Sequence, residues 1–275
     1  MNTDNSFLGE HFDAGLTVEE GDNVSEVLGI KKYEPELPAT MRGRATGEYI
    51  QHTMSYDFES IQKNPNLFDE NDTVLVTEKL HGTLMCVGFI PELSDPELFG
   101  EANNIFVSSK GIMKQGFILK NLKDNSGNLY VSALNDLLSK GLEINLNSII
   151  SANKTVHLFF EVFGSGVQDL TYGQNNKTYR LFDIAIDKQY LDSAKFIEYA
   201  KLLELETVPI LYHGPFLKDK MVELRDGLDT ISSSHIREGI VIKDYFGGYH
   251  PRYGRKIAKF VSPDYLLRKN GTEFN

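Results

Sequence analysis

One lysine stands where a short hydrophobic run ends, in the stretch VTEKLHGT (76–83). The preceding run TVLV (73–76) predicts a buried strand, and Lys79 follows it closely. A lysine in such a place is usually only the first solvated residue after a strand. The alternative is a nucleophile, because a neutral lysine amine can form a covalent intermediate with a substrate. The rest of the chain decides between these interpretations.

Five further stretches contain charged or aromatic residues that could belong to a site. Any one of them is weak evidence, because solvated carboxylates, a core phenylalanine or a basic surface edge would each explain it. Together with the stretch around Lys79 they form an ordered series of six, which is hard to produce by chance. The five are SSKG (108–111), FFEVFG (159–164), YRLFDIAI (179–186), REGIVIK (237–243) and KIAKFVS (256–262).

The predicted elements supply a frame for these residues. Helical periodicity is found at 132–140 and 193–205. Strands in runs with inserted helices indicate an α+β fold of mainly antiparallel sheets with flanking helices. We expect residues 1–45, which contain two prolines in KKYEPELP, to form an extension or linker, and 46–275 to form one domain. The predicted strands, rich in Val, Ile, Phe or Tyr, lie at 83–90, 104–111, 156–164, 178–186 and 238–245.

Composition limits the class of protein. No apolar run approaches the ~20 residues that cross a bilayer, and the N-terminus lacks a signal-peptide pattern. The single cysteine, Cys86, cannot form an internal disulfide. We therefore expect a cytoplasmic protein, a monomer with no membrane partner. The net charge of −11 argues against extensive nonspecific coating of nucleic acid, but YHPRYGRKIAKF (249–260) leaves a local basic surface with interleaved aromatics.

In order, type and spacing, the six stretches resemble the motif set of the covalent nucleotidyltransferases, which are the ATP-dependent RNA and DNA ligases and the mRNA capping enzymes. The match spans about two thirds of the chain. The resemblance implies the nucleotidyltransferase domain of a ligase. Within that superfamily, VTEKLHGT, LGIKKYEPELP and KFVSPDYLLRK resemble the Deinococcus radiodurans type of RNA ligase. Longer members of that branch carry an N-terminal OB-like domain, so we expect either a naturally minimal ligase or a shortened one.

The resemblance implies that Lys79 attacks the α-phosphorus of ATP, forms lysyl-AMP and releases pyrophosphate. The amine must be neutral to do so, and the ordinary lysine pKa is ~10.4. Cationic neighbours and partial burial favour the neutral form. We expect Lys243, Lys256 and Lys259, together with a divalent metal, to supply that environment and to hold the triphosphate.

The same resemblance implies contacts to the nucleotide. Glu161 is expected to bind the ribose hydroxyls, and Phe182 to stack on the adenine. Lys110 stands where many relatives have arginine and would contact ribose or phosphate as a point charge. Asp183 would orient a neighbouring group, and Glu78 would help to read the adenine edge, chiefly through its backbone. The implied ATP-binding residues are Glu78, Lys79, His81, Gly82, Lys110, Glu161, Phe182, Lys243 and Lys259.

Glu238 and His81 are the candidates for the metal. A carboxylate such as that of Glu238 suits Mg²⁺ or Mn²⁺, directly or through water. Most relatives have aspartate at the place of His81, and imidazole prefers softer metals. We therefore hypothesise that His81 contacts a phosphate or a metal-bound water, with Mn²⁺ supporting activity at least as well as Mg²⁺. Arg237 and PRYGRKIAKF are candidates for contact with polynucleotide or triphosphate.

The implied function is ATP-dependent joining of RNA ends, with nicks in a duplex as the expected substrate. A DNA ligase or a GTP-using capping enzyme is an alternative, but these normally need a C-terminal OB domain that the sequence leaves no room for. A non-catalytic nucleotide- or RNA-binding protein on a decayed ligase fold is a second alternative. The presence of Lys79, Glu161, Glu238, Lys243 and Lys259 argues against it.

Overall fold

The computed structural model describes residues 44–102, 104–109, 117–150, 154–269 and 271. These residues belong to one unit of the chain, residues 39–275, and the other unit, residues 1–38, lies outside the described residues. Almost all of the predicted N-terminal extension therefore lies outside them, and so does Lys110.

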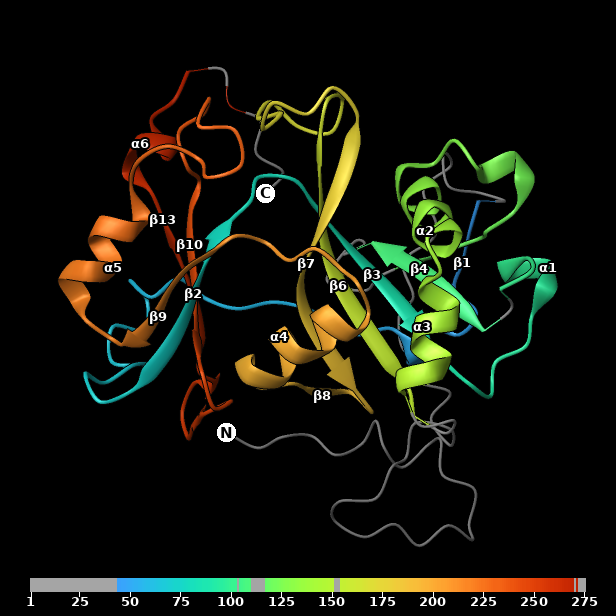
Figure 1. The fold of residues 1–275 in the computed structure, drawn as a ribbon, viewed down its shortest axis with the longest axis horizontal. Helices are drawn as coiled ribbons and strands as arrows, with labels where there is room; N and C mark the ends of the chain where they lie inside the picture. Colours follow the sequence, from blue (N-terminus) through green and yellow to red (C-terminus); the bar gives the residue numbers. More distant parts are fainter. Residues whose placement is uncertain (1–43, 103, 110–116, 151–153, 270, 272–275) are drawn as a thin grey trace, which may run out of the picture. The chain divides into compact units, whose positions relative to one another are not determined.

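Two antiparallel sheets form most of this unit (Figure 1). The larger has seven strands in the order β1-β5-β4-β3-β6-β7-β8, and the smaller has four in the order β13-β10-β2-β9. A hairpin of β11 (Tyr249–His250) and β12 (Gly254–Arg255) follows β10. The larger sheet contains β1 (Ala45–Thr46), β3 (Thr83–Phe89), β4 (Ile105–Ser109), β5 (Ile118–Leu119), β6 (Val156–Gly164), β7 (Lys177–Ile186) and β8 (Gln189–Tyr190). The smaller contains β2 (Thr73–Lys79), β9 (Ile210–Pro215), β10 (Gly239–Asp244) and β13 (Ile257–Val261).

The chain passes from the smaller sheet to the larger one within three residues. Strand β2 ends at Lys79 and β3 begins at Thr83, so residues 80–82 connect the two sheets. Both strands are interior strands of their sheets, which fixes this connection from both sides. Any side chain on it is therefore held by the backbone pairing of two sheets.

Helices contact the strands at several places. Helix α2 contacts β4 and β7, α4 contacts β7, and α5 contacts β10. Among the described residues, no helix combines the length and the hydrophobicity that crossing a membrane requires. The helices are α1 (Pro96–Phe99), α2 (Leu129–Ser139), α3 (Leu142–Ile149), α4 (Ser193–Leu202), α5 (Lys218–Arg225) and α6 (Pro263–Leu266), with 3₁₀ turns at Ile50–His52 and Lys123–Asn125.

The α+β class with antiparallel sheets is confirmed. The predicted helix at 132–140 begins earlier, at Leu129, because the side chain of Asn128 accepts hydrogen bonds from the first backbone amides. Strand β9 and helices α3 and α5 were not predicted. Strand β9 shows no alternation of buried and exposed residues, so its period was invisible in the sequence.

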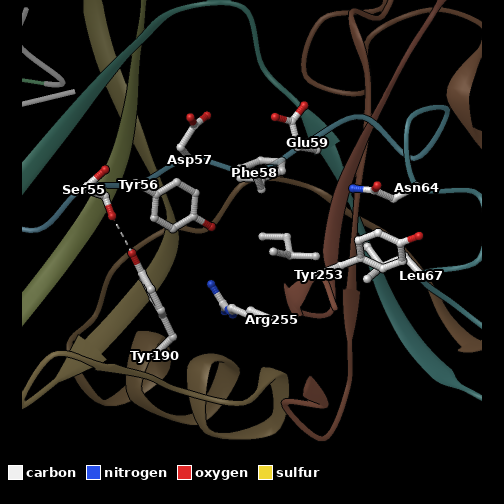
Figure 2. A pocket seen from close by; sticks show the side chains of 11 residues that line it. Ser55, Tyr56, Asp57, Phe58, Glu59, Asn64, Leu67, Tyr190, Tyr253 and Arg255 are labelled. Carbon is white, nitrogen blue, oxygen red and sulfur yellow. Dashed lines mark hydrogen bonds between the residues drawn. The ribbon is translucent and has the colours of Figure 1, made fainter. Parts of the chain in front are cut away.

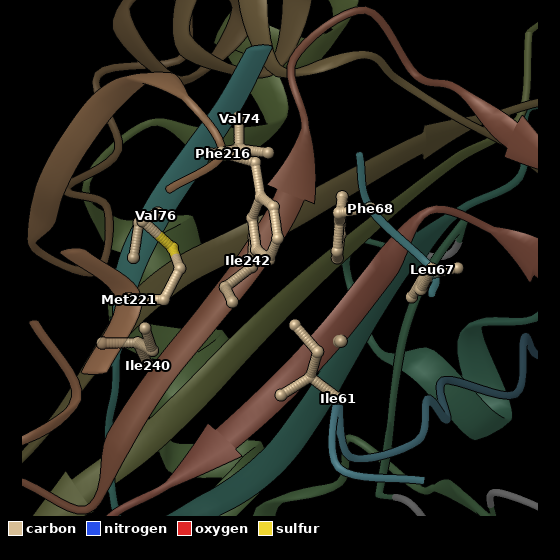
Figure 3. Close-up of a cluster of buried hydrophobic side chains, with 10 residues drawn as sticks. Ile61, Leu67, Phe68, Val74, Val76, Phe216, Met221, Ile240 and Ile242 are labelled. Carbon is tan, nitrogen blue, oxygen red and sulfur yellow. The ribbon is translucent and has the colours of Figure 1, made fainter. Parts of the chain in front are cut away.

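One face of the smaller sheet packs into a hydrophobic cluster (Figure 3). Val74 and Val76 of β2 lie there beside Ile240 and Ile242 of β10. Alternate residues of a strand point to opposite faces. The odd-numbered residues of β2 and β10, which include Lys79 and Lys243, therefore project from the other face.

Candidate active site

Three of the predicted lysines share one face of the smaller sheet. Lys79 on β2 pairs with Gly239 on β10, and Val241, two residues further along β10, pairs with Lys259 on β13. Lys243 lies two residues beyond Val241 on the same strand. The alternation of side chains places Lys79, Lys243 and Lys259 on one face. They are spread along it. Lys243 lies four residues beyond Gly239, the partner of Lys79, which is about 13 Å along the strand.

Lys79 forms an ion pair with a carboxylate. Its Nζ lies 2.5 Å from Oε1 of Glu238, which precedes β10. Both side chains are largely buried, with 26% of Lys79 and 9% of Glu238 exposed. The structure thus brings the predicted nucleophile and the predicted metal ligand together. A carboxylate beside a lysine favours the ammonium form of that lysine.

Gly82 holds the connection between the sheets close to β6. A Cβ atom added at Gly82 would lie 2.2 Å from the carbonyl oxygen of Val162 and 3.1 Å from Cγ of Glu161. The side-chain amide of Gln168 also donates to the carbonyl of Gly82, at 2.9 Å. Glu161, predicted to bind the ribose, therefore lies beside the same connection as Lys79.

Replacing Gly82 with alanine is expected to displace this connection. The obstruction is a backbone oxygen, which a rotamer change cannot relieve, so the strands must separate at a cost of about 1–3 kcal/mol. We expect Gly82→Ala to lower the rate of ATP-dependent adenylylation about 10- to 100-fold, because the reacting groups lose their alignment. Intact-mass kinetics measure this. Gly127→Ala is the matched control, since nothing lies within 4 Å of its added Cβ; equal rates for both variants and the wild type would contradict the expectation.

Lys243 belongs to a buried charged network. Its Nζ lies 3.0 Å from Oδ2 of Asp183 and 2.5 Å from the carbonyl oxygen of Phe182. Arg255 donates two hydrogen bonds to Asp183, at 2.7 and 3.2 Å, and the hydroxyl of Tyr56 donates a third at 2.6 Å. Burial lowers the pKa of Lys243 to about 8, against the charge of Asp183. Lys243 thus forms an ion pair with Asp183 and a hydrogen bond with the backbone of Phe182.

Asp183 is ionised in this network. Burial alone would raise its pKa, but the charges of Lys243 and Arg255 and the hydrogen bonds from Arg255 and Tyr56 together outweigh burial, and the pKa of Asp183 is lowered. The neighbouring Phe182 ring is partly buried and borders two hydrophobic clusters. Its ring centroid is 5.0 Å from that of Tyr56, in an edge-on arrangement. The network therefore supports Phe182, which is the residue predicted to stack on adenine, through its backbone carbonyl.

Lys256 lies at the other end of the sheet. Its Nζ is 2.6 Å from Oδ2 of Asp72, which immediately precedes β2, whereas Lys79 ends that strand. The length of the seven-residue strand, about 20 Å, separates the two lysines. The structure does not bring Lys256 to Lys79.

Glu78 and Arg237 form a second buried pair. The side chain of Glu78 accepts hydrogen bonds from the hydroxyl and backbone amide of Thr230, at 2.5 and 3.0 Å. Arg237 lies with Nε 3.8 Å from Glu78 and donates to the carbonyls of Leu224 and Asp226. Burial raises the pKa of Glu78, partly offset by Thr230. The side chains of Glu78 and Arg237 are thus held inside the protein, away from the face that carries Lys79.

Both ring nitrogens of His81 have protein partners. Nε2 lies 2.7 Å from Oδ1 of Asp169, and Nδ1 lies 2.7 Å from the hydroxyl of Tyr265. The backbone amide of His81 donates to the hydroxyl of Tyr172 at 2.6 Å. In this arrangement the ring has no nitrogen to offer a metal, and its predicted contact with a metal-bound water or phosphate would require one of these bonds to open.

The residues do fit a divalent cation at Glu238. Its Oε2 atom is buried and has no hydrogen-bond partner among the described residues. Within that part of the chain, no group of three His, Cys, Asp or Glu side chains is arranged to hold a metal. Such a cation would therefore depend on Glu238, water and phosphate oxygens, which is the usual way that Mg²⁺ is held beside a nucleotide.

A cavity of about 290 Å³ lies elsewhere (Figure 2). Tyr56, Arg255 and Tyr190 line it on one side, and the carboxylates of Asp57 and Glu59 lie opposite. Of the stretches predicted to contact substrate, PRYGRKIAKF contributes Tyr253, Arg255 and Ile257 to the lining, whereas Lys79 and Glu238 do not line the cavity. The carboxylates of Asp57 and Glu59 do not suit a triphosphate or an RNA backbone, so we place the chemistry at Lys79 instead.

Sequence reasoning did not assign roles to several residues around Lys79. Asp169 and Tyr172 lie between β6 and β7, and their partner His81 is about ninety positions earlier in the chain. Tyr265 lies in KFVSPDYLLRK, a stretch whose resemblance was noted without a role for Tyr265. Arg255 lies in the predicted basic tail segment, but it binds Asp183.

The α+β fold of antiparallel sheets and helices matches the nucleotidyltransferase domain of RNA ligases. The model of the RNA ligase family matches residues 72–261, and the chain therefore belongs to the RNA ligase family of enzymes. No curated protein matches the sequence significantly.

Solved structures of Naegleria gruberi RNA ligase share the fold. The form with PPi has a TM-score of 0.63 at 24% identity and covers 90% of this chain and 66% of that chain. A variant with ATP and Mn has a TM-score of 0.63 at 23% identity, covering 90% and 67%. A variant with AMP and Mn has a TM-score of 0.63 at 23% identity and covers 92% of this chain and 68% of that chain. The chain thus spans about two thirds of that enzyme's length, and the likeness establishes the fold alone.

Proposed function

We propose that this protein is an ATP-dependent RNA ligase that seals 5′-phosphate and 3′-hydroxyl ends. Lys79 takes AMP from ATP, the AMP passes to the 5′-phosphate, and the 3′-hydroxyl displaces it to form the phosphodiester. The observation that carries this proposal is the largely buried pair of Lys79 and Glu238 at the junction of two sheets, in a chain of the RNA ligase family. Nicks are the proposed substrate, and the Deinococcus radiodurans type is the proposed branch.

The described side chains can bind and orient the nucleotide. Phe182, braced by the Asp183 network, offers an aromatic face to adenine. Glu161 lies beside Gly82 and so reaches the same connection as the nucleophile, where it would accept from the ribose hydroxyls. Lys259 shares the face of Lys79 and would balance phosphate charge. Glu78 and Gly82 would contribute backbone groups, and Lys110, outside the described residues, stays a predicted contact.

Lys79 must lose a proton before it attacks phosphorus, and Glu238 is placed to control this. At 2.5 Å the carboxylate holds the ammonium in position. A divalent cation held at Glu238 would draw the carboxylate's charge away from Lys79 and neutralise phosphate oxygens. Lys243 pairs with Asp183, and Lys256 pairs with Asp72. These two lysines therefore support the site from a distance and do not contact the reacting groups.

The alternatives differ in nucleotide and polymer. A capping-type enzyme would take GTP, a DNA ligase would seal nicks in DNA, and a non-catalytic protein would take neither. The presence of Lys79 together with Glu161 and Glu238 argues against the last, in a chain of the RNA ligase family. Cytoplasmic location and a monomeric state stay predictions of the sequence.

Ligation of matched nicked duplexes tests the proposal. We expect ATP with Mg²⁺ or Mn²⁺ to seal a nick whose strands are RNA, and GTP to fail. Denaturing gels measure the product, and an all-DNA nick of the same sequence is the control. Sealing of DNA alone, labelling by GTP alone, or no covalent nucleotide with either metal would contradict the proposal in favour of one named alternative each.

The metal preference of a His81 variant tests the role of this residue. If His81 contacts a metal-bound water, His81→Asp is expected to change the ratio of activities in Mg²⁺ and Mn²⁺, because a hard carboxylate replaces an imidazole. Initial ligation rates over a series of concentrations of each metal measure this ratio. An unchanged activity with an unchanged metal preference would remove His81 from the mechanism.

A further inference from the structure

Two parts of the chain far from β2 hold the His81 ring. The imidazole is only 5% exposed, and its partners Asp169 and Tyr265 are 88 and 184 positions away in sequence. Asp169 lies between β6 and β7, and Tyr265 lies in α6. Neither contact is a product of local chain geometry, so both require the tertiary fold.

Arg268 joins the two partners of the ring. It donates to both carboxylate oxygens of Asp169, at 3.1 and 3.3 Å, and to the backbone carbonyl of Tyr265 at 2.8 Å. Its guanidinium also lies over the Tyr265 ring, 3.6 Å from the ring centroid. A single side chain thus fixes the carboxylate on one side of His81 and the phenol on the other.

The chemistry of these groups sets the tautomer of His81. A carboxylate paired with arginine only accepts hydrogen bonds, so Nε2 of His81 carries the hydrogen that points to Asp169. Nδ1 faces the hydroxyl of Tyr265, which can donate its hydrogen to this nitrogen. The ring cannot turn over without breaking both bonds.

The held ring borders the reacting pair. Nδ1 of His81 lies 4.0 Å from Oε2 of Glu238, whose Oε1 contacts Lys79. The backbone amide of His81 is bound as well, by the Tyr172 hydroxyl. The ring therefore limits where the Glu238 carboxylate can lie, and through it where the amine of Lys79 can lie.

We propose that Asp169, Tyr265 and Arg268 are positioning residues that hold His81 in one orientation and tautomer beside Glu238, and so align Lys79 for adenylylation. The inference rests on the proposed function for its kinetic consequence, but the arrangement of the ring is independent of it. The competing interpretation is that the three residues only anchor α6 to the segment that carries Asp169.

A double-mutant cycle separates these interpretations. We expect Asp169→Asn and Tyr265→Phe each to slow single-turnover adenylylation by about 10- to 100-fold, because orientation of the reacting groups is lost. Tyr265→Phe retains the ring that Arg268 covers. In a His81→Gln background the same two substitutions are expected to change the rate by less than about twofold, because their effect passes through His81. Tyr212→Phe is the matched control, since its hydroxyl donates to the carbonyl of Pro215 in the same strand.

Equal slowing in both backgrounds would show that the residues do not act through His81 and would overturn the proposal. Wild-type rates in both single variants would overturn it too. A wild-type protein that takes no AMP would instead contradict the proposed function.

The tautomer provides a readout that needs no activity. Nitrogen-15 NMR of histidine-labelled protein is expected to show one ring with hydrogen on Nε2 and an unprotonated Nδ1, with that signal absent from His81→Gln. Asp169→Asn is expected to shift it or to mix the tautomers. A wild-type His81 signal with hydrogen on Nδ1, or a signal unchanged in Asp169→Asn, would overturn the proposal whatever the enzyme does.

Discussion

Replacement of Lys79 by arginine is expected to abolish transfer of AMP to the protein. Arginine retains the positive charge and reach needed to pair with Glu238, so the local structure should persist. The guanidinium cannot be deprotonated in a protein and so cannot attack phosphorus. We expect the adenylylation rate to fall at least about 1000-fold, to the limit of detection.

Transfer of label from α-labelled ATP, followed by denaturing gels, measures this effect. Lys63→Arg is the matched control, because the Lys63 side chain is 70% exposed and its described ion pair is with Glu59, four positions earlier. We expect that variant to label like the wild type. Labelling of Lys79→Arg at a rate near the wild type would remove Lys79 as the nucleophile.

Asp183→Asn is expected to have the largest effect on stability. It leaves the buried charges of Lys243 and Arg255 without their common partner. Breaking a buried ion pair by removing one member costs about 3–5 kcal/mol, because the remaining charge stays desolvated. The backbone of Phe182, which accepts from Lys243, loses its support as well, so ATP binding should weaken together with stability.

The contribution of Asp183 to the free energy of unfolding depends on pH. The pKa of Asp183 is lowered in the folded protein. Its contribution to stability is therefore complete above the unfolded value of about 3.9 and is lost as the pH falls below it. We expect the free energy of unfolding of the wild type to fall more steeply below about pH 4 than that of Asp183→Asn.

Urea unfolding at neutral and acidic pH measures both effects. Asp187→Asn is the control at the same end of β7, since Asp187 is exposed and pairs with Lys154 at the surface. That variant is expected to unfold like the wild type. Equal stability of Asp183→Asn and Asp187→Asn at neutral pH would contradict the account of the buried network.

The fold class and the location of the chemistry were predictable because both leave local patterns. Strand β2 is a continuous apolar run that ends at Lys79, and Glu238 directly precedes the apolar run of β10. The long-range partners were not predictable. Asp183 and Lys243 are sixty positions apart on strands of different sheets, and only the tertiary fold brings them together.

The separation of Lys256 from Lys79 could have been inferred from the sequence. Residues three apart in a strand lie on opposite faces, so Lys256 and Lys259 cannot both project beside Lys79. The structure has Lys259 on the face of Lys79, and Lys256 with Asp72 at the far end of the sheet. Likewise, the adjacent residues Glu78 and Lys79 must diverge, and Glu78 binds Thr230 on the other side.

The partners of His81 left no local signal at all. Asp169 comes from one segment and Tyr265 and Arg268 from another, and none of the three has an assigned role in the sequence. A histidine two residues after a candidate nucleophile suggests direct contact with substrate or metal. Only the tertiary structure shows that its two nitrogens are bound to protein groups.

Intact-mass spectrometry with peptide mapping tests the central claim most directly. The wild type is first treated with pyrophosphate to remove any AMP already attached, and then incubated with ATP and Mg²⁺ or Mn²⁺. The account predicts a mass increase of one AMP, located at Lys79, labile to acid and stable to base as a phosphoramidate is. No increase with either metal, or an AMP attached to another residue, would contradict it.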